Sequence, residues 1–469
     1  MGVARALRRW SWPAITAAWL ATAAGAAALP AEEARHLLSR SGFGATPADI
    51  AALADLDRVA AVAAVLDAAA ARAAAGAVTA PPAWTANWTP PNAATLGEIE
   101  RLALRNEIRE QGRALKGWWL REMLTTPAPL TEVMTLFWHN HFTSSLAKVQ
   151  VPVLLFRQNT LLRRHALGNF ADLLHAIARD PAMLLYLDNA DSRAEAPNEN
   201  FAREMMELFT LGEGHYGEAD LKDAARSFTG WSVDADTGAF RFRPTWHDHD
   251  GKTIFGRSGA FDGDTVIGLL LARPETAEFV VAKLWRQFVS ERPDPAEVAR
   301  LAALFRDGGY EITPLLAALF VSEAFWAPEN RGRLLKSPVD LVVGTLRLFD
   351  LPVEDHRDLA WITYRLGQDL FDPPDVKGWP GGTAWITSAT LLDRRAFLGR
   401  LTGAAGEDDA TRAALFDRWV ADLPQPWQDA EAVTLLLLPV APVDAEVLDR
   451  RASGAQLRSL LADPAYQLK

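Results

Sequence analysis

The chain has 469 residues, of which 49% are hydrophobic and 23% are charged, so it can bury one large core or two smaller ones. Its formal charge of −11 at pH 7 argues against a nucleic-acid-binding surface. The chain contains no cysteine, which excludes disulfides and thiolate chemistry. Any metal site must therefore use histidine and carboxylate ligands.

Residues 1–29 have the pattern of an export signal. Arg5, Arg8 and Arg9 form a basic start, an alanine-rich apolar run follows, and residues 24–26 are small enough for cleavage. An uncleaved membrane anchor is the alternative. The pattern predicts a periplasmic or secreted protein with no stable membrane span after cleavage, exported by either the general or the twin-arginine route.

The remaining chain is predicted to be mainly α. We expect an N-terminal helical segment over residues 30–75, a Pro/Ala-rich linker over 76–95, a main helical domain over 96–403 and a C-terminal helical tail over 404–469. The one β element that the sequence predicts is a hairpin between Trp231 and Pro244. Long loops rich in Pro, Gly and Trp interrupt the helices. Helices are expected at 96–125, 131–142, 151–166, 169–178, 218–228, 264–272, 274–290, 295–307, 312–323, 338–349 and 391–401.

The helix over residues 131–142 ends in two histidines, His139 and His141. His141 follows Val133 and Phe137 at spacings of four, so it points with the apolar face. His139 lies about 200° away around the helix and cannot share a metal ion with His141 unless the helix unwinds. For each histidine, a hydrogen-bonded structural role and a ligand role both stay open.

A second helix is predicted between Asn198 and Gly212, with an asparagine (Asn198 or Asn200) as N-cap and the glycine as stop signal. Glu204 falls at the edge of its apolar stripe, where a carboxylate needs a partner. Glu207 follows three residues later, and Arg203 can reach it at i+4. These side chains could form a structural ion-pair network or a functional carboxylate pair.

Two loops are rich in residues that bind ligands. His247 and Asp248 follow the predicted hairpin and could supply a metal ligand with its hydrogen-bond acceptor. Residues 366–382 cannot be regular structure and contain Trp379, and such loops often line a site. A solvated loop and an architectural connector are the respective alternatives.

Several motifs occur in order along the chain: Leu37 to Gly44, Phe137 to Phe142, Asn198 to Gly212, Phe228 to Trp231, His247-Asp248 with Lys252-Thr253, and Pro373-Pro374-Asp375 with Gly378-Trp379-Pro380. Together they resemble a bacterial family catalogued as domain of unknown function 1800, over about residues 31–403. The resemblance implies an exported, mostly helical protein, often encoded beside a second exported family related to sulfatases and phosphatases. It implies no particular reaction. His249 and Asp250 are additions around the family's His-Asp loop.

We draw two hypotheses. The first is an exported hydrolase that acts on a glycan or another cell-surface polymer, using either a divalent metal or paired carboxylates. The second is a non-catalytic helical scaffold or partner for the neighbouring exported protein. In the first, His141, Glu204 and His247 should lie within one metal site. The assigned roles are catalysis for Glu204, Glu207 and Asp248, substrate binding for Asn198, Asn200, Arg203, Trp231 and Trp379, and metal binding for His139, His141 and His247.

Overall fold

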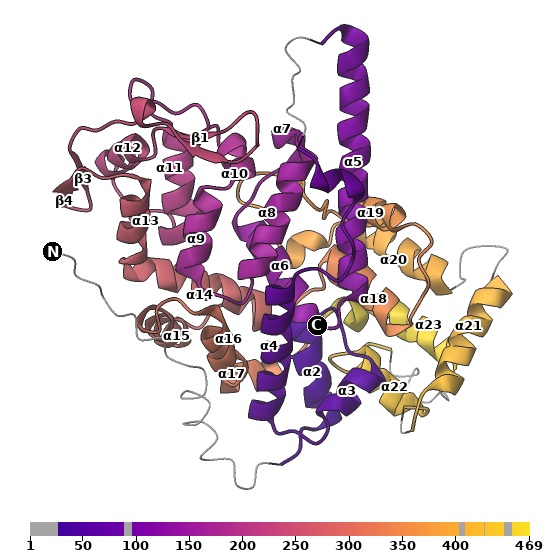
Figure 1. Cartoon of the computed structure of the whole chain (residues 1–469). Helices are drawn as coiled ribbons and strands as arrows, with labels where there is room; N and C mark the ends of the chain where they lie inside the picture. Colours follow the sequence, from indigo (N-terminus) through magenta and orange to yellow (C-terminus); the bar gives the residue numbers. More distant parts are fainter. Residues whose placement is uncertain (1–26, 89–95, 403–408, 426, 445–452) are drawn as a thin grey trace.

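The computed structural model describes residues 27–88, 96–402, 409–425, 427–444 and 453–469, and this part of the chain is mainly α-helical (Figure 1). Its helices are α2 (Ala31–Ser41), α3 (Pro47–Leu53), α4 (Arg58–Ala75), α5 (Glu98–Thr125), α6 (Pro129–His141), α7 (Leu146–Val149), α8 (Pro152–His165), α9 (Phe170–Ala178), α10 (Pro181–Tyr186), α11 (Glu199–Met206), α12 (Glu218–Ser227), α13 (Gly263–Leu271), α14 (Pro274–Phe288), α15 (Pro295–Asp307), α16 (Ile312–Phe320), α17 (Glu323–Trp326), α18 (Pro338–Leu348), α19 (His356–Arg365), α20 (Ser388–Thr402), α21 (Asp409–Asp422), α22 (Ala430–Leu437) and α23 (Gly454–Ala462).

The β structure consists of two short antiparallel hairpins. The predicted hairpin is present as β1 (Trp231–Val233) paired with β2 (Phe240–Phe242). A second hairpin pairs β3 (Lys252–Ile254) with β4 (Arg257–Gly259), so the expectation of a single β element was wrong. Ile254 is the one apolar residue of these two strands, so the alternating apolar residues that mark the first hairpin are missing here and sequence reasoning did not find it.

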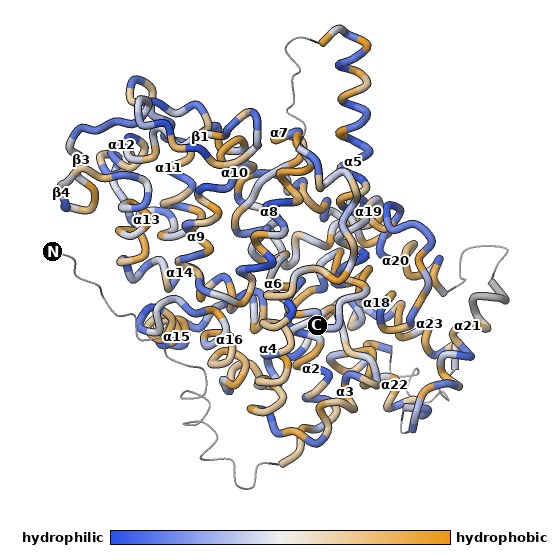
Figure 2. Tube along the Cα trace, in the orientation of Figure 1, coloured by the Kyte–Doolittle hydropathy of each residue, from blue (hydrophilic) through white to orange (hydrophobic). Residues whose placement is uncertain are grey.

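One continuous hydrophobic core extends from Leu29 near the start of the described chain to Tyr466 near its end. Figure 2 shows hydrophobic and hydrophilic residues alternating along the helices. Helices α2 and α22, from opposite ends of the sequence, contact each other in this core. At the end of α2, the guanidinium of the fully buried Arg40 donates to the carbonyls of Phe288 and Val289, each at 3.0 Å, and so fixes the end of α14.

Helix α5 stands away from the body over its first turns (Figure 1) and becomes buried only from Gly112 onward. The segment before it was predicted as a linker, and residues 89–95 of that segment lie outside the described residues. Its described part is not free of the body, because the backbone amides of Val78 and Thr79 donate to the buried carboxylate of Glu122.

No helix among the described residues is long and apolar enough to cross a membrane. Nearly all of the predicted export signal, residues 1–26 of 1–29, lies outside the described residues.

The central helix begins and stops as its sequence predicts. Asn198 caps α11 by accepting hydrogen bonds from the amides of Asn200 and Phe201. Gly212 ends the segment with a φ of 81°, a conformation that favours glycine. The sequence did not predict that the last turn, Glu207–Leu211, widens into a π-helix. Such turns often occur at functional sites because they redirect backbone carbonyls.

Candidate functional site

A cleft of about 580 Å³ lies in the described structure, within the usual size range of small-molecule and substrate sites. Its walls come from the ends of α6 and α14, the segment leading into α18, and the loop that contains Trp379. Its charged lining side chains are four basic and two acidic ones, so the cleft has an excess of positive charge although the chain is acidic. They are Lys283, Arg286, Lys377 and Lys469, with Glu291 and Asp340.

The end of α6 holds the loop that forms one wall of this cleft. The amide of Asn140 pairs with the backbone of Trp379, accepting from its N–H at 2.7 Å and donating to its carbonyl at 3.3 Å. Gly378 has a φ of 82°, and a Cβ there would lie 2.2 Å from Oδ1 of Asn140. Only glycine therefore permits this close contact, which explains the glycine before the tryptophan.

His139 is sealed behind the same loop. Its ring lies among those of Trp119, Phe371 and Trp379, with centroid distances of 5.4, 5.4 and 5.7 Å. Burial lowers the pKa of His139 to about 4, so the ring is neutral at pH 7. No described residue hydrogen-bonds its Nε2 atom. The surroundings are those of a structural histidine.

His141 lies on the cleft wall and contacts a lysine from α14. Its Nε2–H donates to the carbonyl of Phe209 at 3.1 Å, so its Nδ1 atom is an acceptor. The Nζ atom of Lys283 donates to this Nδ1 at 3.0 Å and to the carbonyl of Leu208 at 3.3 Å. Burial, and next the charge of Lys283, hold the pKa of His141 well below its usual range.

Lys283 is the most perturbed cation of the cleft. Burial, and next the positive charge of Arg286, lower the pKa of its ammonium to about 8. Its two acceptors leave one tetrahedral position of Nζ without an oxygen or nitrogen partner in the described part of the chain, where the ring centroid of Phe279 lies 4.6 Å from Nζ. Because Lys283 lines the cleft, this position is available to a ligand.

The π-helical turn connects the central helix to this pair. Leu208 and Phe209, whose carbonyls accept from Lys283 and His141, both belong to Glu207–Leu211. Both residues lie in the last turn before Gly212, where backbone carbonyls have no partner within the helix. These two carbonyls therefore accept from side chains of two other helices.

The carboxylates of the central helix lie beside the cleft and do not line it. Burial raises the pKa of Glu204, which is 8% exposed, and the negative charge of Glu207 raises it further. Glu207 accepts a 2.6 Å hydrogen bond from the Tyr216 hydroxyl. Arg203 lies 3.9 Å from Glu199, and no Arg203–Glu207 ion pair is formed among the described residues.

Three other residues predicted to bind substrate have structural contacts and do not line the cleft. Asn198 and Asn200 both donate to the carbonyl of Leu187, at 2.9 and 3.5 Å. Trp231 is 4% exposed and packs under the guanidinium of Arg179. Trp379, in contrast, does line the cleft as expected.

The His247–Asp248 loop is fixed to α12 by its own ion pairs. Asp248 accepts two hydrogen bonds from Arg226, at 2.7 and 3.1 Å. Burial alone would raise the pKa of Asp248, but the hydrogen bonds from Arg226 hold it below its usual value. His247 Nδ1 lies 2.9 Å from the carbonyl oxygen of Thr229.

The expected meeting of His141, Glu204 and His247 in one metal site is not found. Among the residues that the structure describes, no three histidine or carboxylate side chains form a group that could hold a metal ion. The reason is that each candidate has other partners. His141 accepts a hydrogen bond from Lys283, and His139 is enclosed by aromatic rings. The Nδ1 atom of His247 lies near the carbonyl oxygen of Thr229, just after α12.

The sequence model of the family described as "Protein of unknown function (DUF1800)" matches residues 36–468, nearly the whole chain. The chain belongs to the DUF1800 family. Comparisons with curated proteins and with solved structures gave no match. In this DUF1800 chain, the family-like motifs around His139–His141 and Trp379 meet at one wall of the cleft.

Sequence reasoning missed Lys283 and Arg286, which supply the cleft of this DUF1800 chain with positive charge. A signal was available for Lys283. It lies three residues after Val280 and directly before Leu284, both fully buried, so a lysine stands at the edge of an apolar stripe. Such a lysine needs a polar partner, as Glu204 does.

Proposed function

We propose that this protein is an exported hydrolase that acts on an anionic cell-surface polymer, such as an acidic glycan, in the cleft beside α6. The observation that carries the proposal is Lys283. Its pKa is lowered to about 8, and it lines a cleft large enough for a substrate. A base with a pKa near the working pH is the most effective proton acceptor.

In this proposal Lys283 removes a proton from the attacking water. The neutral amine keeps two N–H groups for His141 and the carbonyl of Leu208, and its lone pair occupies the third position, which has no hydrogen-bonding partner in the described part of the chain. His141 positions Lys283, because its Nδ1 atom can accept only while the ring is neutral. The buried surroundings of His141 keep its ring in that form.

Recognition of an anionic polymer rests on the lining of the cleft. Arg286 is an exposed cation that can pair with carboxylate or sulfate groups, and Lys377, now 3.5 Å from the exposed Glu213 carboxylate, can exchange that partner for one on the ligand. Trp379 and Trp385 line the same cleft but are only 5% and 7% exposed, so only their edges can contact a sugar ring. The positive charge favours an acidic saccharide over a neutral one.

The test uses purified protein with a panel of acidic and neutral polysaccharides, scored for binding by calorimetry and for hydrolysis by release of new chain ends. We expect Arg286→Gln to weaken binding of acidic polymers about tenfold, as loss of one charge-assisted contact implies. The matched control is Arg300→Gln on α15, where the arginine is exposed and paired with Glu297. Equal binding of neutral polymers, or an unaffected Arg286→Gln variant, would contradict the proposal.

A non-catalytic role as helical partner of a neighbouring exported protein is the second candidate. It is favoured by the Asp248–Arg226 pair and the sealed His139, since these polar motifs are accounted for by contacts within the chain. Cross-linking in the native envelope tests it. Recovery of a sulfatase- or phosphatase-related protein as the main product, with no hydrolysis of any polymer, would support this candidate against the first.

Export is part of both candidates and rests on the sequence of residues 1–29. Mass spectrometry of the protein from its native envelope tests it. Removal of that segment is the expected result, and an intact Met1 to Leu29 would contradict it.

A further inference from the structure

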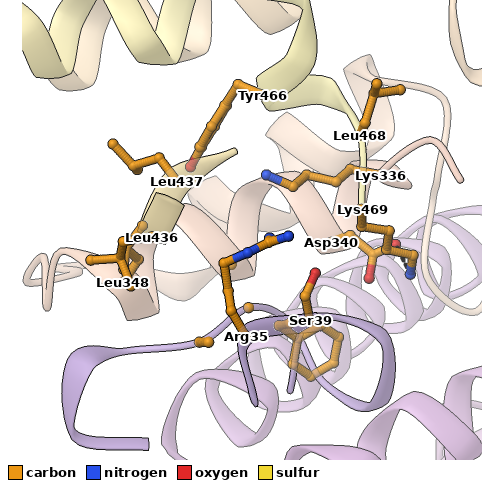
Figure 3. A pocket seen from close by; sticks show the side chains of 14 residues that line it. Arg35, Ser39, Lys336, Asp340, Leu348, Leu436, Leu437, Tyr466, Leu468 and Lys469 are labelled. Carbon is orange, nitrogen blue, oxygen red and sulfur yellow. Dashed lines mark hydrogen bonds and ion pairs between the residues drawn. The ribbon is translucent and has the colours of Figure 1, made fainter. Parts of the chain in front are cut away.

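A second, smaller cavity lies on the other side of one wall of the cleft. It has a volume of about 30 Å³ and is formed by α2, α18, α22 and the last residues of the chain (Figure 3). Phe43, Asp340 and Lys469 line both cavities and so form the wall between them. Because about 10–15 Å³ is enough for one water, the smaller cavity has room for a small ion and not for an organic cofactor.

Three hydrogen-bond donors point into this space without an acceptor. Figure 3 shows Arg35, Lys336 and Ser39 directed toward the same space. Arg35 is 4% exposed, and no atom of its guanidinium has a hydrogen-bond acceptor within the described chain. The ammonium of Lys336 lies 3.7 Å above the ring centroid of Tyr466, and it too has no oxygen acceptor in that part of the chain.

The acids near this cavity have other partners. Asp340 uses its Oδ2 atom for the Lys469 ammonium at 2.8 Å and for the amide of Ser337 at 3.0 Å. Glu32, whose charge acts on Arg35, is paired with Arg331. Asp340 lines the cavity and its charge attracts Lys336, but within the described chain it forms no hydrogen bond with Lys336 or Arg35, so both cations lack a carboxylate as hydrogen-bond acceptor.

Uncompensated buried charge is costly, and the titration of Lys336 reflects this cost. Burial, and next the charge of Arg35, lower the pKa of its ammonium to about 7. The charges of Lys469 and Arg394 act in the same direction. An anion in the cavity would remove this cost, since it offers acceptors to all three donors and balances the charge.

We propose that this cavity is a binding site for a small inorganic oxyanion, with Arg35, Lys336 and Ser39 as its ligands. The planar fork of Arg35 matches two oxygens of a tetrahedral oxyanion. Lys336 supplies the second charge, and the Ser39 hydroxyl supplies a neutral donor. This site is independent of the function proposed for the cleft, because it uses different side chains on the far side of the shared wall.

Equilibrium dialysis of the full chain against radiolabelled sulfate and phosphate tests the site at constant ionic strength. We expect one oxyanion bound per chain and a saturable rise in melting temperature with sulfate or phosphate. Arg35→Met and Lys336→Met should each weaken oxyanion binding at least tenfold. The matched control is Arg113→Met, which removes an exposed arginine of α5 and should bind as the wild type does.

Both variants remove an uncompensated cation, so they should fold, and far-ultraviolet circular dichroism checks this. Absence of saturable binding to the wild type would overturn the proposal. So would unchanged binding in both variants, or chloride binding as tightly as sulfate, because a site built on the arginine fork should prefer the oxyanion.

Discussion

Replacing Lys283 by methionine should make the protein more stable at neutral pH while abolishing hydrolysis. Burial, together with the charge of Arg286, lowers the pKa of the Lys283 ammonium from 10.5 to about 8. Since one pKa unit corresponds to about 1.4 kcal/mol, keeping this proton in the folded state at pH 7 costs about 3 kcal/mol. Methionine has a similar length and no charge, so it removes this cost.

The variant also loses two hydrogen bonds, to His141 and to the carbonyl of Leu208. At about 1 kcal/mol each, their loss offsets part of the gain. We therefore expect the free energy of unfolding of Lys283→Met to exceed that of the wild type by about 1 kcal/mol at pH 7.

The pH dependence gives the sharper test. Between pH 8 and 10.5 the unfolded chain binds a proton at Lys283 that the folded chain does not, so the stability of the wild type rises with pH through this window. The variant lacks this rise. The variant's excess free energy of unfolding over the wild type should disappear by about pH 9, and the variant should be less stable than the wild type by about 2 kcal/mol near pH 10.5.

Urea unfolding followed by tryptophan fluorescence at pH 7, 9 and 10.5 measures the difference. The control is Lys222→Met on α12, where the exposed ammonium lies 3.9 Å from Glu218. It should change stability by less than about 0.5 kcal/mol at each pH. The reasoning is refuted if Lys283→Met is less stable than wild type at pH 7, or if the two stability curves run parallel.

Two further predictions concern the cleft wall and acid stability. Gly378→Ala should cost more than 2 kcal/mol in urea unfolding, because its Cβ would lie 2.2 Å from Oδ1 of Asn140. Gly381→Ala is its control, since φ there is also positive but no atom lies within 4 Å, so it should cost only about 1 kcal/mol. Burial lowers the pKa of His36 to about 3 and that of His139 to about 4. Below pH 6.5 these histidines bind protons in the unfolded chain but not yet in the folded chain, so each should lower the free energy of unfolding by about 1.4 kcal/mol per pH unit. A flat urea stability profile from pH 6.5 to 5 would contradict the second prediction.

The helical fold could be predicted because its signals are local. The helix predicted at 295–307 is α15, Pro295–Asp307, with its proline at the first position and Asp294 as cap. Likewise, Asn198 and Gly212 mark the two ends of the central segment within fifteen residues of sequence. Caps and stops depend on a side chain and its own backbone, so they can be identified without knowing the rest of the fold.

The candidate site could be predicted only in part because its contacts are distant in sequence. His141 was identified from its place on an apolar face, but its partner Lys283 lies 142 residues away. No residue next to His247 in the sequence indicates that Arg226 donates hydrogen bonds to the carboxylate of Asp248. The π-helical turn was also hidden, since Glu207–Leu211 continues the same apolar stripe as the helix before it.

The attachment of the Trp379 loop to α6 has a consequence for the rate at which a ligand enters the cleft. Swinging this loop outward would break both hydrogen bonds between Asn140 and Trp379 and expose the neutral ring of His139. We therefore expect this wall to stay closed during ligand entry, so that association needs no slow opening step before encounter. The association rate is then set by diffusion and by long-range attraction to Arg286 and Lys377, so it should fall steeply with ionic strength and change little with the stiffness of the loop.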